Sequence, residues 1–387
     1  MDKMADVLGR AGAWCGQNKY LSAIKNAFQN FMPLTIAGAI GVLWCNVLVN
    51  DQTGLGLFFK PIMALDFLNP AFQAVNFCTI SCITVGITLG IAQEIGVWNM
   101  GAEKAGYIPG LVGLAAWLSV TNTSHMVDGA KEAFTGIAGN ELGATGLFTG
   151  MIIGVLSVEL FCFFEKQDAL KIKMPEQVPP GVARAFEVLV PATITLIITA
   201  CIGSACYNLT GLYLNDVIKN GIQGPLGAVG ATIPGVMIIY LVIMLFWLVG
   251  IHGNNMLSAV KEALFTPLAL ENVEAFNKGE TPKNIINMYA LQMWGEFGGS
   301  GVTIGLVIAI MIFGKREDNK AIATLSLVPG LFNINETVTF GIPMVLNPIL
   351  GIPFVVAPLI TIIIGYVLTA IGFCPVACLT VPWTTPP

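Results

Sequence analysis

The chain has 387 residues, of which 55% are hydrophobic and 11% are charged, and its formal net charge is −5. A soluble domain carries about 25% charged residues, so this composition excludes an ordinary soluble protein. The mean hydropathy of +0.77 indicates a polytopic membrane protein. The net charge is small and spread along the chain, which argues against a nucleic-acid partner.

The first twenty residues are mixed polar in character. They lack the basic region, short apolar run and small-residue cleavage site of a signal peptide. The first apolar segment is therefore expected to be kept as a membrane span.

Eight stretches are apolar enough for membrane helices, which need about 20 mostly apolar residues. They are Phe31–Val49, Phe72–Ile95, Tyr107–Val120, Thr145–Phe164, Val188–Tyr207, Pro234–Gly250, Val302–Phe313 and Phe354–Phe373. The seventh is short, and we expect it to begin earlier, within the glycine-rich Phe297–Gly301.

Three clusters of basic residues lie beside these stretches, and basic loops tend to be cytoplasmic. They precede the first span, follow the fourth and follow Phe313. Four spans return the chain to the side on which it began, so the first two basic clusters lie on the same side of the membrane. The N-terminus is predicted to be cytoplasmic.

The segment Lys166–Arg184 contains three prolines and reads as a cytoplasmic linker between two halves. The second half is less regular than the first. Asn255–Ser300 is too polar for a plain span, yet it carries apolar residues that a soluble loop would expose to water. A re-entrant hairpin is the better prediction for this region.

The stretch Asn333–Pro358 is apolar but contains four prolines, at 343, 348, 353 and 358. Each proline removes an amide donor and clashes with the preceding helical turn. The stretch is therefore predicted to be a broken helix. Irregular backbone at membrane depth occurs only where protein or a watery cavity covers it, so this stretch is expected to line a site.

Polar side chains stand at the head of that stretch, in Asn333, Asn335 and Glu336. An ionisable group within a membrane segment is costly and is a functional candidate. The Glu336 carboxylate can accept hydrogen bonds from sugar hydroxyls or titrate as a proton carrier. The alternative is a structural carboxylate bonded to backbone amides of its own broken helix.

A second polar cluster follows the sixth span, at His252, Gly253 and Asn254. Glycine lets the backbone turn and approach a ligand closely, and histidine can hydrogen-bond or take a proton near neutral pH. The alternative is a helix-end histidine bonded to backbone carbonyls.

Three tryptophans lie near these clusters in sequence, at Trp247, Trp294 and Trp383. Indole faces stack on sugar rings, although an interfacial aromatic belt is the competing explanation. Asn140 precedes the fourth span, where capping of that helix is the simpler role.

Several site types find no support in the sequence. It contains no Gly-x-x-x-x-Gly-Lys-[Ser/Thr] loop for ATP and no His-Glu-x-x-His metal helix. The nine cysteines form no Cys-x-x-Cys pair, so neither a metal nor another cofactor is expected. A net acidic, aromatic-lined pocket suits a neutral polyhydroxylated solute better than an anion.

Three motifs together carry a family resemblance: Gly250-Ile-His-Gly-Asn254, Asn333-Ile-Asn-Glu-Thr337 with its following prolines, and Pro382-Trp-Thr-Thr-Pro386. In this order the chain resembles the lactose/cellobiose/diacetylchitobiose family of phosphotransferase-system enzyme IIC permeases. The likeness runs over nearly the whole chain.

The resemblance implies an all-α polytopic membrane protein with about 9–10 transmembrane helices and two re-entrant hairpins. It implies a homodimer in a bacterial cell membrane. Residues 1–185 would form the dimer-interface domain with its cytoplasmic linker, and residues 186–387 the sugar-binding transport domain. Family members continue into a further helix after the Pro-Trp-Thr-Thr-Pro motif, whereas this sequence stops at Pro387, so we expect it either to be a fragment or to lack the last span.

The resemblance also implies roles for particular residues. His252 and Glu336 correspond to the motif residues that bind the sugar beside the hydroxyl to be phosphorylated. Trp383 corresponds to the tryptophan of the last motif, and Asn140 to an asparagine near the sugar. The phosphoryl group would come from a phosphorylated cytosolic IIB partner, so the chain would be the transport subunit of a sugar phosphotransferase.

We therefore predict a permease that carries a β-linked disaccharide inward by alternating access and presents it to phosphorylated IIB. One rival is a proton-coupled secondary sugar transporter that uses Glu336 and His252 as a proton relay. Another is an intramembrane enzyme that uses the same pair. The sequence leaves open which disaccharide is carried and whether either residue is a general base.

Overall fold

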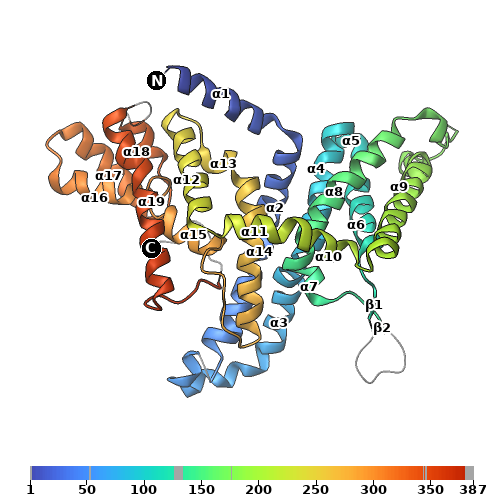
Figure 1. The fold of residues 1–387 in the computed structure, drawn as a ribbon, viewed down its shortest axis with the longest axis horizontal. Helices are drawn as coiled ribbons and strands as arrows, with labels where there is room; N and C mark the ends of the chain where they lie inside the picture. The colour runs from blue at the N-terminus through green and yellow to red at the C-terminus, as the bar shows by residue number, and fades with distance from the viewer. Residues whose placement is uncertain are drawn as a thin grey trace. The chain divides into compact units, whose positions relative to one another are not determined.

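The computed structural model describes residues 2–51, 54–125, 134–175, 177–342, 344 and 347–379, and these residues are predominantly helical (Figure 1). The chain forms two compact units. Unit 1 comprises Met1–Asn18, Ala39–Asn69 and Leu226–Pro387, and unit 2 comprises Lys19–Gly38 and Pro70–Pro225. The chain alternates between the two units along its first 70 residues and returns to unit 1 at Leu226. The two units therefore differ from a linear division at residue 185. The expected assignment of dimer-interface and transport roles to residues 1–185 and 186–387 stays a prediction.

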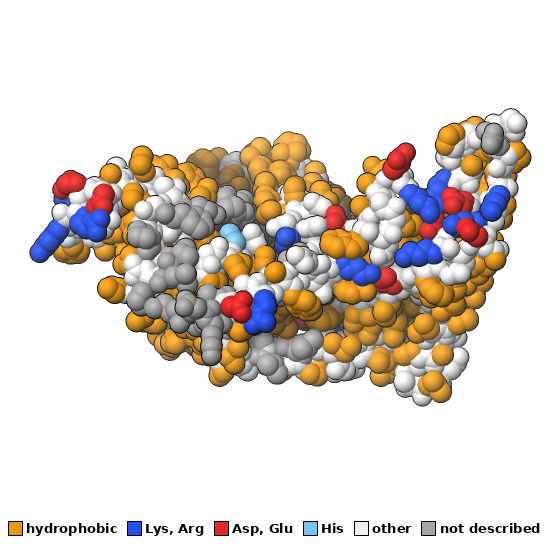
Figure 2. Space-filling model, turned by 90° about the horizontal axis from the view of Figure 1, so that it is seen from above, with side chains coloured by type: hydrophobic (Ala, Val, Ile, Leu, Met, Phe, Trp, Pro, Cys, Tyr) orange, Lys and Arg blue, Asp and Glu red, His pale blue; other side chains and the backbone are white. Residues whose placement is uncertain are grey.

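Several described helical stretches are long and apolar enough to cross a membrane. They are Lys19–Leu48, Lys60–Met100, Thr145–Glu165, Pro180–Thr210 and Ile349–Ala370, and shorter apolar helices occupy Ile108–Val120, Ile233–Leu248 and Thr303–Phe313. Each of the eight predicted spans coincides with one of these stretches. Hydrophobic side chains cover much of the face drawn in Figure 2. The protein is an all-α polytopic membrane protein, as expected.

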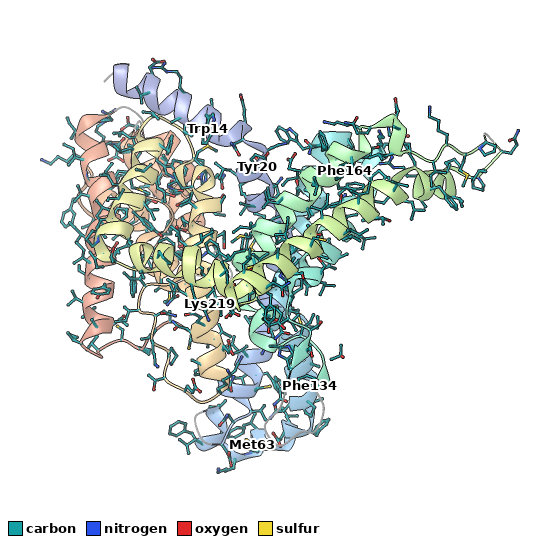
Figure 3. The ribbon with its side chains drawn as sticks, turned by 45° about the vertical axis from the view of Figure 1, so that its right-hand side comes forward. Trp14, Tyr20, Met63, Phe134, Phe164 and Lys219 are labelled. Atoms are coloured by element: carbon teal, nitrogen blue, oxygen red, sulfur yellow. The ribbon has the colours of Figure 1, made fainter. Side chains whose placement is uncertain are left out.

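Unit 2 is built mainly from helices. Its elements are α2 (Lys19–Leu43), α3 (Asn69–Cys78), the 3-10 turn η4 (Ile80–Cys82), α4 (Ile83–Met100), α5 (Ala102–Ala105), α6 (Ile108–Val120), α7 (Gly139–Leu142), α8 (Ala144–Glu165), the 3-10 turn η5 (Asp168–Leu170), α9 (Pro180–Thr210), α10 (Leu214–Ile218) and the π-helical η6 (Lys219–Gln223). A two-stranded antiparallel ribbon, β1 (Ser124–His125) and β2 (Phe134–Thr135), pairs Ser124 with Thr135. Figure 3 labels Phe134 in this ribbon.

The core of unit 2 lies where α4, α6 and α8 pack together. Isoleucines at every fourth position of α4, among them Ile87, Ile91 and Ile95, are completely buried. Glycines on the facing helices allow the backbones to approach closely, which is how helices pack in membranes. A Cβ atom added at Gly113 of α6 would lie 2.3 Å from the Cβ of Ala92 on α4.

Gly113→Ala is expected to destabilise unit 2 by about 1–3 kcal/mol, because Ala92 has no side-chain torsion by which its Cβ can move away. The matched control is Gly181→Ala in α9, where an added Cβ meets nothing within 4 Å. The control should be neutral or stabilising, since alanine favours a helix over glycine by about 1 kcal/mol. Thermal unfolding of the purified variants measures both effects, and equal shifts would contradict the packing argument.

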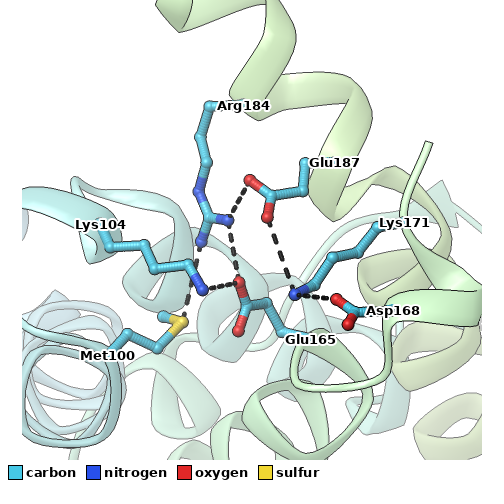
Figure 4. Close-up of polar contacts among 7 residues, drawn as sticks. All are labelled: Met100, Lys104, Glu165, Asp168, Lys171, Arg184 and Glu187. Carbon is cyan, nitrogen blue, oxygen red and sulfur yellow. Dashed lines mark hydrogen bonds and ion pairs between the residues drawn. The ribbon is translucent and has the colours of Figure 1, made fainter. Parts of the chain in front are cut away.

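A network of ion pairs joins the ends of three helices in unit 2 (Figure 4). Glu165 is the last residue of α8, and its side chain is 1% exposed. It pairs with Lys104 at 2.8 Å and with Arg184 of α9 at 2.9 Å. Arg184 also pairs with Glu187 at 2.7 Å. A negative charge at a helix C-terminus opposes the helix dipole, and the two cations offset this cost.

The predicted linker Lys166–Arg184 is shorter in the structure. It contains η5 and an irregular segment, and α9 begins at Pro180. Proline is well tolerated at the first helical position because that amide has no helical acceptor. Five residues of the expected linker therefore belong to α9.

Unit 1 holds the remaining elements. They are α1 (Asp2–Gln17), the π-helical η1 (Trp44–Leu48), the 3-10 turns η2 (Leu55–Leu57) and η3 (Lys60–Leu68), α11 (Gly224–Gly230), α12 (Ile233–Leu248), α13 (Gly253–Met256), α14 (Ser258–Asn277), α15 (Met288–Gly295), α16 (Thr303–Phe313), α17 (Glu317–Leu331), α18 (Glu336–Gly341) and α19 (Pro348–Ala370). Its core includes Met244 and Trp247 of α12, Val307 of α16 and Phe354 of α19. Figure 3 labels the exposed Trp14 on α1.

One expectation about helix breaks in unit 1 is wrong and another is confirmed in part. The stretch Asn333–Pro358 is broken as expected, since α18 ends at Gly341 and α19 begins at Pro348. Helix α16 begins at Thr303 and does not extend into Phe297–Gly301, because Gly298, Gly299 and Gly301 have positive φ angles that end a right-handed helix. Pro353 and Pro358 lie inside α19 and do not interrupt it. Of the four prolines, Pro348 sits in the first turn of α19, and Pro343 lies outside the described residues.

Candidate functional site

The candidate site lies within unit 1, where three loops meet. The first loop follows α12 and carries His252. The second is the glycine-rich turn 297–302 between α15 and α16. The third joins α17 to α18 and carries Asn333 and Asn335. Side-chain hydrogen bonds link the second loop to each of the other two.

His252 lies at the N-terminus of α13, and its Nδ1 atom accepts a hydrogen bond from the Asn255 amide at 3.3 Å. Because Nδ1 accepts, the hydrogen of the neutral ring is on Nε2. The ring lies 4.4 Å, between centroids, from that of Trp247, which is 1% exposed and also contacts Phe354. The alternative expected for His252 was a helix-end histidine bonded to backbone carbonyls. His252 does lie at a helix end, but its ring accepts a hydrogen bond from a backbone amide and does not donate to a carbonyl in this contact.

Gly253 is where the first loop turns back onto α12. A Cβ atom added at this position would lie 2.0 Å from the carbonyl oxygen of Ile243. A larger residue would push the loop away from α12. Close backbone approach therefore explains this glycine without a ligand.

Asn254 joins the first loop to the second. Its Nδ2 donates to the Ser300 hydroxyl at 2.7 Å, and its Oδ1 accepts from Lys261 at 3.3 Å. Ser300 is 4% exposed and Lys261 is 4% exposed. The amide therefore connects two buried groups, and its direct contact with a ligand stays a prediction.

Asn333 and Asn335 hold the second loop from the other side. Asn333 accepts from the Gly298 amide at 2.8 Å, and its own φ angle is +62°. Asn335 donates to the Ser300 carbonyl at 2.8 Å. Gly299 has φ +91°, and a Cβ there would lie 2.6 Å from the Cβ of Asn335, so the contact requires glycine. Both asparagines shape the loop, and a further role as sugar ligands stays a prediction.

Trp294 lies in α15, and its indole packs on Gly365 of α19, where an added Cβ would be 2.4 Å away. This packing accounts for the residue without a ligand. Glu336 begins α18, but its side chain lies outside the described part of the chain. The same holds for the side chain of Asn140 in α7 of unit 2, and the whole of Trp383 lies outside the described residues.

The site also contains residues that are not among the predicted site residues. Lys261 of α14 pairs with Glu296 at the end of α15, and Glu296 accepts from the Tyr240 hydroxyl at 3.1 Å. An ionisable residue among apolar positions is a functional signal in a membrane protein. Lys261 is such a residue, but α14 contains several other charged residues. The sequence does not show which of them is buried, and the fold shows that Lys261 is.

The chain has clear relatives. A family model described as "Phosphotransferase system, EIIC" matches residues 25–358. The chain is 32% identical to the oligo-beta-mannoside-specific EIIC component of Bacillus subtilis, over 100% of this chain and 85% of that protein. It is 32% identical to the lactose-specific EIICB component of Staphylococcus aureus, over 96% of this chain and 63% of that longer protein.

A solved structure has the same fold. It is the crystal structure of the transporter ChbC, the IIC component from the N,N'-diacetylchitobiose-specific phosphotransferase system. The TM-score is 0.87 and the identity is 30%, and the match covers 97% of this chain and 86% of that chain.

Proposed function

This chain belongs to the EIIC family of the phosphotransferase system, and from that premise we propose how its residues take part in sugar uptake. The protein is a sugar permease for β-linked disaccharides, and it works with a sugar substrate and a IIB component. The sequence had left a proton-coupled transporter open as the alternative, and the relatives favour the phosphotransferase assignment.

The sugar binds in unit 1, where the His252 loop, the turn 297–302 and the Asn333–Glu336 segment meet. The observation that supports this most is the hydrogen bonding of Ser300 to both Asn254 and Asn335. Through these two bonds, the segment that carries His252 and the segment that carries Glu336 are both attached to the buried Ser300. The two segments lie far apart in the sequence.

The His252 ring can donate from Nε2 to a sugar oxygen, since its Nδ1 atom is engaged by the backbone. The Glu336 carboxylate accepts from the hydroxyl that receives the phosphoryl group. Together they orient that hydroxyl, and positioning of this kind supplies much of the acceleration in phosphoryl transfer. The phosphoryl group itself comes from phosphorylated IIB.

Transport follows alternating access, in which the sugar-binding part moves relative to the rest of a homodimer. The N-terminus faces the cytoplasm, because basic clusters precede the first span and follow the fourth. The site then opens toward IIB on the cytoplasmic side. The sugar itself is of the cellobiose, lactose or diacetylchitobiose type.

Sealed vesicles that contain the purified chain test this function. Disaccharide phosphate should accumulate inside only when phosphorylated IIB is enclosed with the sugar outside, and a pH gradient alone should drive no uptake. Concentrative uptake driven by the gradient without IIB would instead support the secondary transporter. Turnover of the sugar by the purified chain without a partner would support the intramembrane enzyme.

The same preparation identifies the sugar. A screen of unfolding temperature with cellobiose, lactose and diacetylchitobiose should reveal stabilisation by the preferred disaccharide, since a ligand that binds only the native state raises its stability.

A further inference from the structure

A chain of buried polar groups runs beneath the candidate site in unit 1. It starts at Tyr240 on α12, which is completely buried and donates to Glu296 at 3.1 Å and to the Leu291 carbonyl at 3.2 Å. Glu296 forms an ion pair with Lys261, whose ammonium also lies 5.6 Å from the centre of the Tyr240 ring. A buried charge is tolerated when it is paired and hydrogen-bonded, and Lys261 meets both conditions.

Lys261 has a second partner beyond the ion pair. Its ammonium donates to Oδ1 of Asn254 at 3.3 Å. An ammonium group has only donors, so the oxygen of the Asn254 amide, not its nitrogen, must face it. The orientation of this amide is therefore determined by chemistry.

The direction of donation then passes from Asn254 to the next group. With its oxygen toward Lys261, Asn254 must present Nδ2 to Ser300, and the Ser300 hydroxyl accepts at 2.7 Å. The Ser300 hydroxyl accepts this bond with one of its two lone pairs, so its own hydrogen is directed elsewhere. The Ser300 carbonyl meanwhile accepts from Asn335, the residue next to Glu336.

We propose that Lys261 is a positioning residue for sugar binding: it fixes the Asn254 amide, and through that amide and Ser300 it holds the three loops of the site in one arrangement. The proposal rests on the proposed function, because it assumes that these loops bind the disaccharide. Lys261 itself touches neither the sugar nor the reacting hydroxyl.

The competing explanation is that Lys261 only neutralises Glu296. Replacing a buried ion pair by apolar or neutral groups is often harmless, whereas removing one partner is strongly destabilising. The two explanations therefore differ for a variant that loses both charges. A variant that neutralises both Lys261 and Glu296 should fold under either explanation. It should keep the parental sugar affinity only if Lys261 has no effect on Asn254.

The test is the double variant Lys261→Met/Glu296→Gln, studied as the purified full chain in detergent. Binding of cellobiose, lactose and diacetylchitobiose is measured by calorimetry, and thermal unfolding is measured alongside. The double variant should unfold near the parent temperature, and its dissociation constant for the bound sugar should rise about tenfold or more, as expected for the loss of an ordering hydrogen bond to a charged group.

The matched control removes an exposed ion pair from the same helix. Lys278 and Glu274 pair at 2.6 Å with side chains 58% and 41% exposed. Lys278→Met/Glu274→Gln should leave both sugar affinity and unfolding temperature unchanged, since exposed pairs contribute little. A folded Lys261→Met/Glu296→Gln variant with parental affinity would overturn the proposal.

Ser300→Ala gives a second decision if the double variant does not fold. It keeps the contact between Lys261 and Asn254 and the backbone bond to Asn335, but it removes the hydroxyl that accepts from Asn254. Loss of sugar affinity with an intact fold would support the proposal, and parental affinity would overturn it. A parent chain that binds none of the three sugars would refute the proposed function, and with it this inference.

Discussion

Glu336→Gln is expected to reduce IIB-dependent phosphorylation of the sugar by about 10²–10⁴-fold, the range contributed by a positioned general base or acceptor. Glutamine has nearly the same shape but no negative charge. It can still accept a hydrogen bond, so sugar affinity should fall less than the phosphorylation rate. The measurement is sugar-phosphate formation with purified phosphorylated IIB, with sugar binding measured in parallel.

The control for this result is Glu317→Gln in α17. The Glu317 side chain is 86% exposed and pairs with Lys320 at 3.2 Å, so its neutralisation should not change either readout. If Glu336→Gln kept full binding and full phosphorylation, the role assigned to Glu336 would be wrong. Lost binding with an unfolded protein would instead indicate the structural carboxylate that the sequence left open.

Glu165→Leu is expected to destabilise the protein by about 3–5 kcal/mol, the cost of removing one partner from a buried ion pair. Leucine would leave Arg184, whose side chain is 18% exposed, without its contact at 2.9 Å. It would also release Lys104, although that side chain is 44% exposed and can be hydrated. Thermal or denaturant unfolding in detergent measures the change.

Two further variants separate charge from packing at this network. Glu187→Leu removes the other carboxylate near Arg184, but Glu187 is 30% exposed, so its loss should cost no more than about 1 kcal/mol. The double variant Glu165→Leu/Arg184→Met should recover part of the stability lost in Glu165→Leu, since it also removes the Arg184 charge that Glu165→Leu leaves paired with Glu187 alone. Equal destabilisation by Glu165→Leu and Glu187→Leu would show that burial does not set the strength of this network.

The helices were predictable from the sequence because hydropathy is a local property. The eight apolar stretches all coincide with helices of the structure. The boundaries were less certain where glycine or proline occurred. Pro353 and Pro358 were expected to break a helix and lie inside α19, since a membrane helix can tolerate proline when neighbouring groups satisfy the freed backbone.

The motifs of the site were also visible in the sequence. His252, Asn254, Asn333 and Asn335 stand out because polar residues beside glycines are unusual among apolar segments. Their residue types limited what they can do, since histidine and asparagine exchange hydrogen bonds with hydroxyl groups. Tryptophan was more ambiguous: Trp247 contacts His252, whereas Trp294 packs on Gly365.

By itself, then, the sequence determined the membrane class, the positions of the helices and the segments that could form a site, because each depends on residues that are close together in the chain. Only the tertiary structure decided which polar groups meet. Asn254 and Ser300 are 46 residues apart, and Gly298 and Asn333 are 35 apart. Lys261 looked like its charged neighbours until the packing of α12, α14 and α15 buried it against Glu296 and Asn254. Burial makes such contacts strong and directional, and burial is a property of the folded chain.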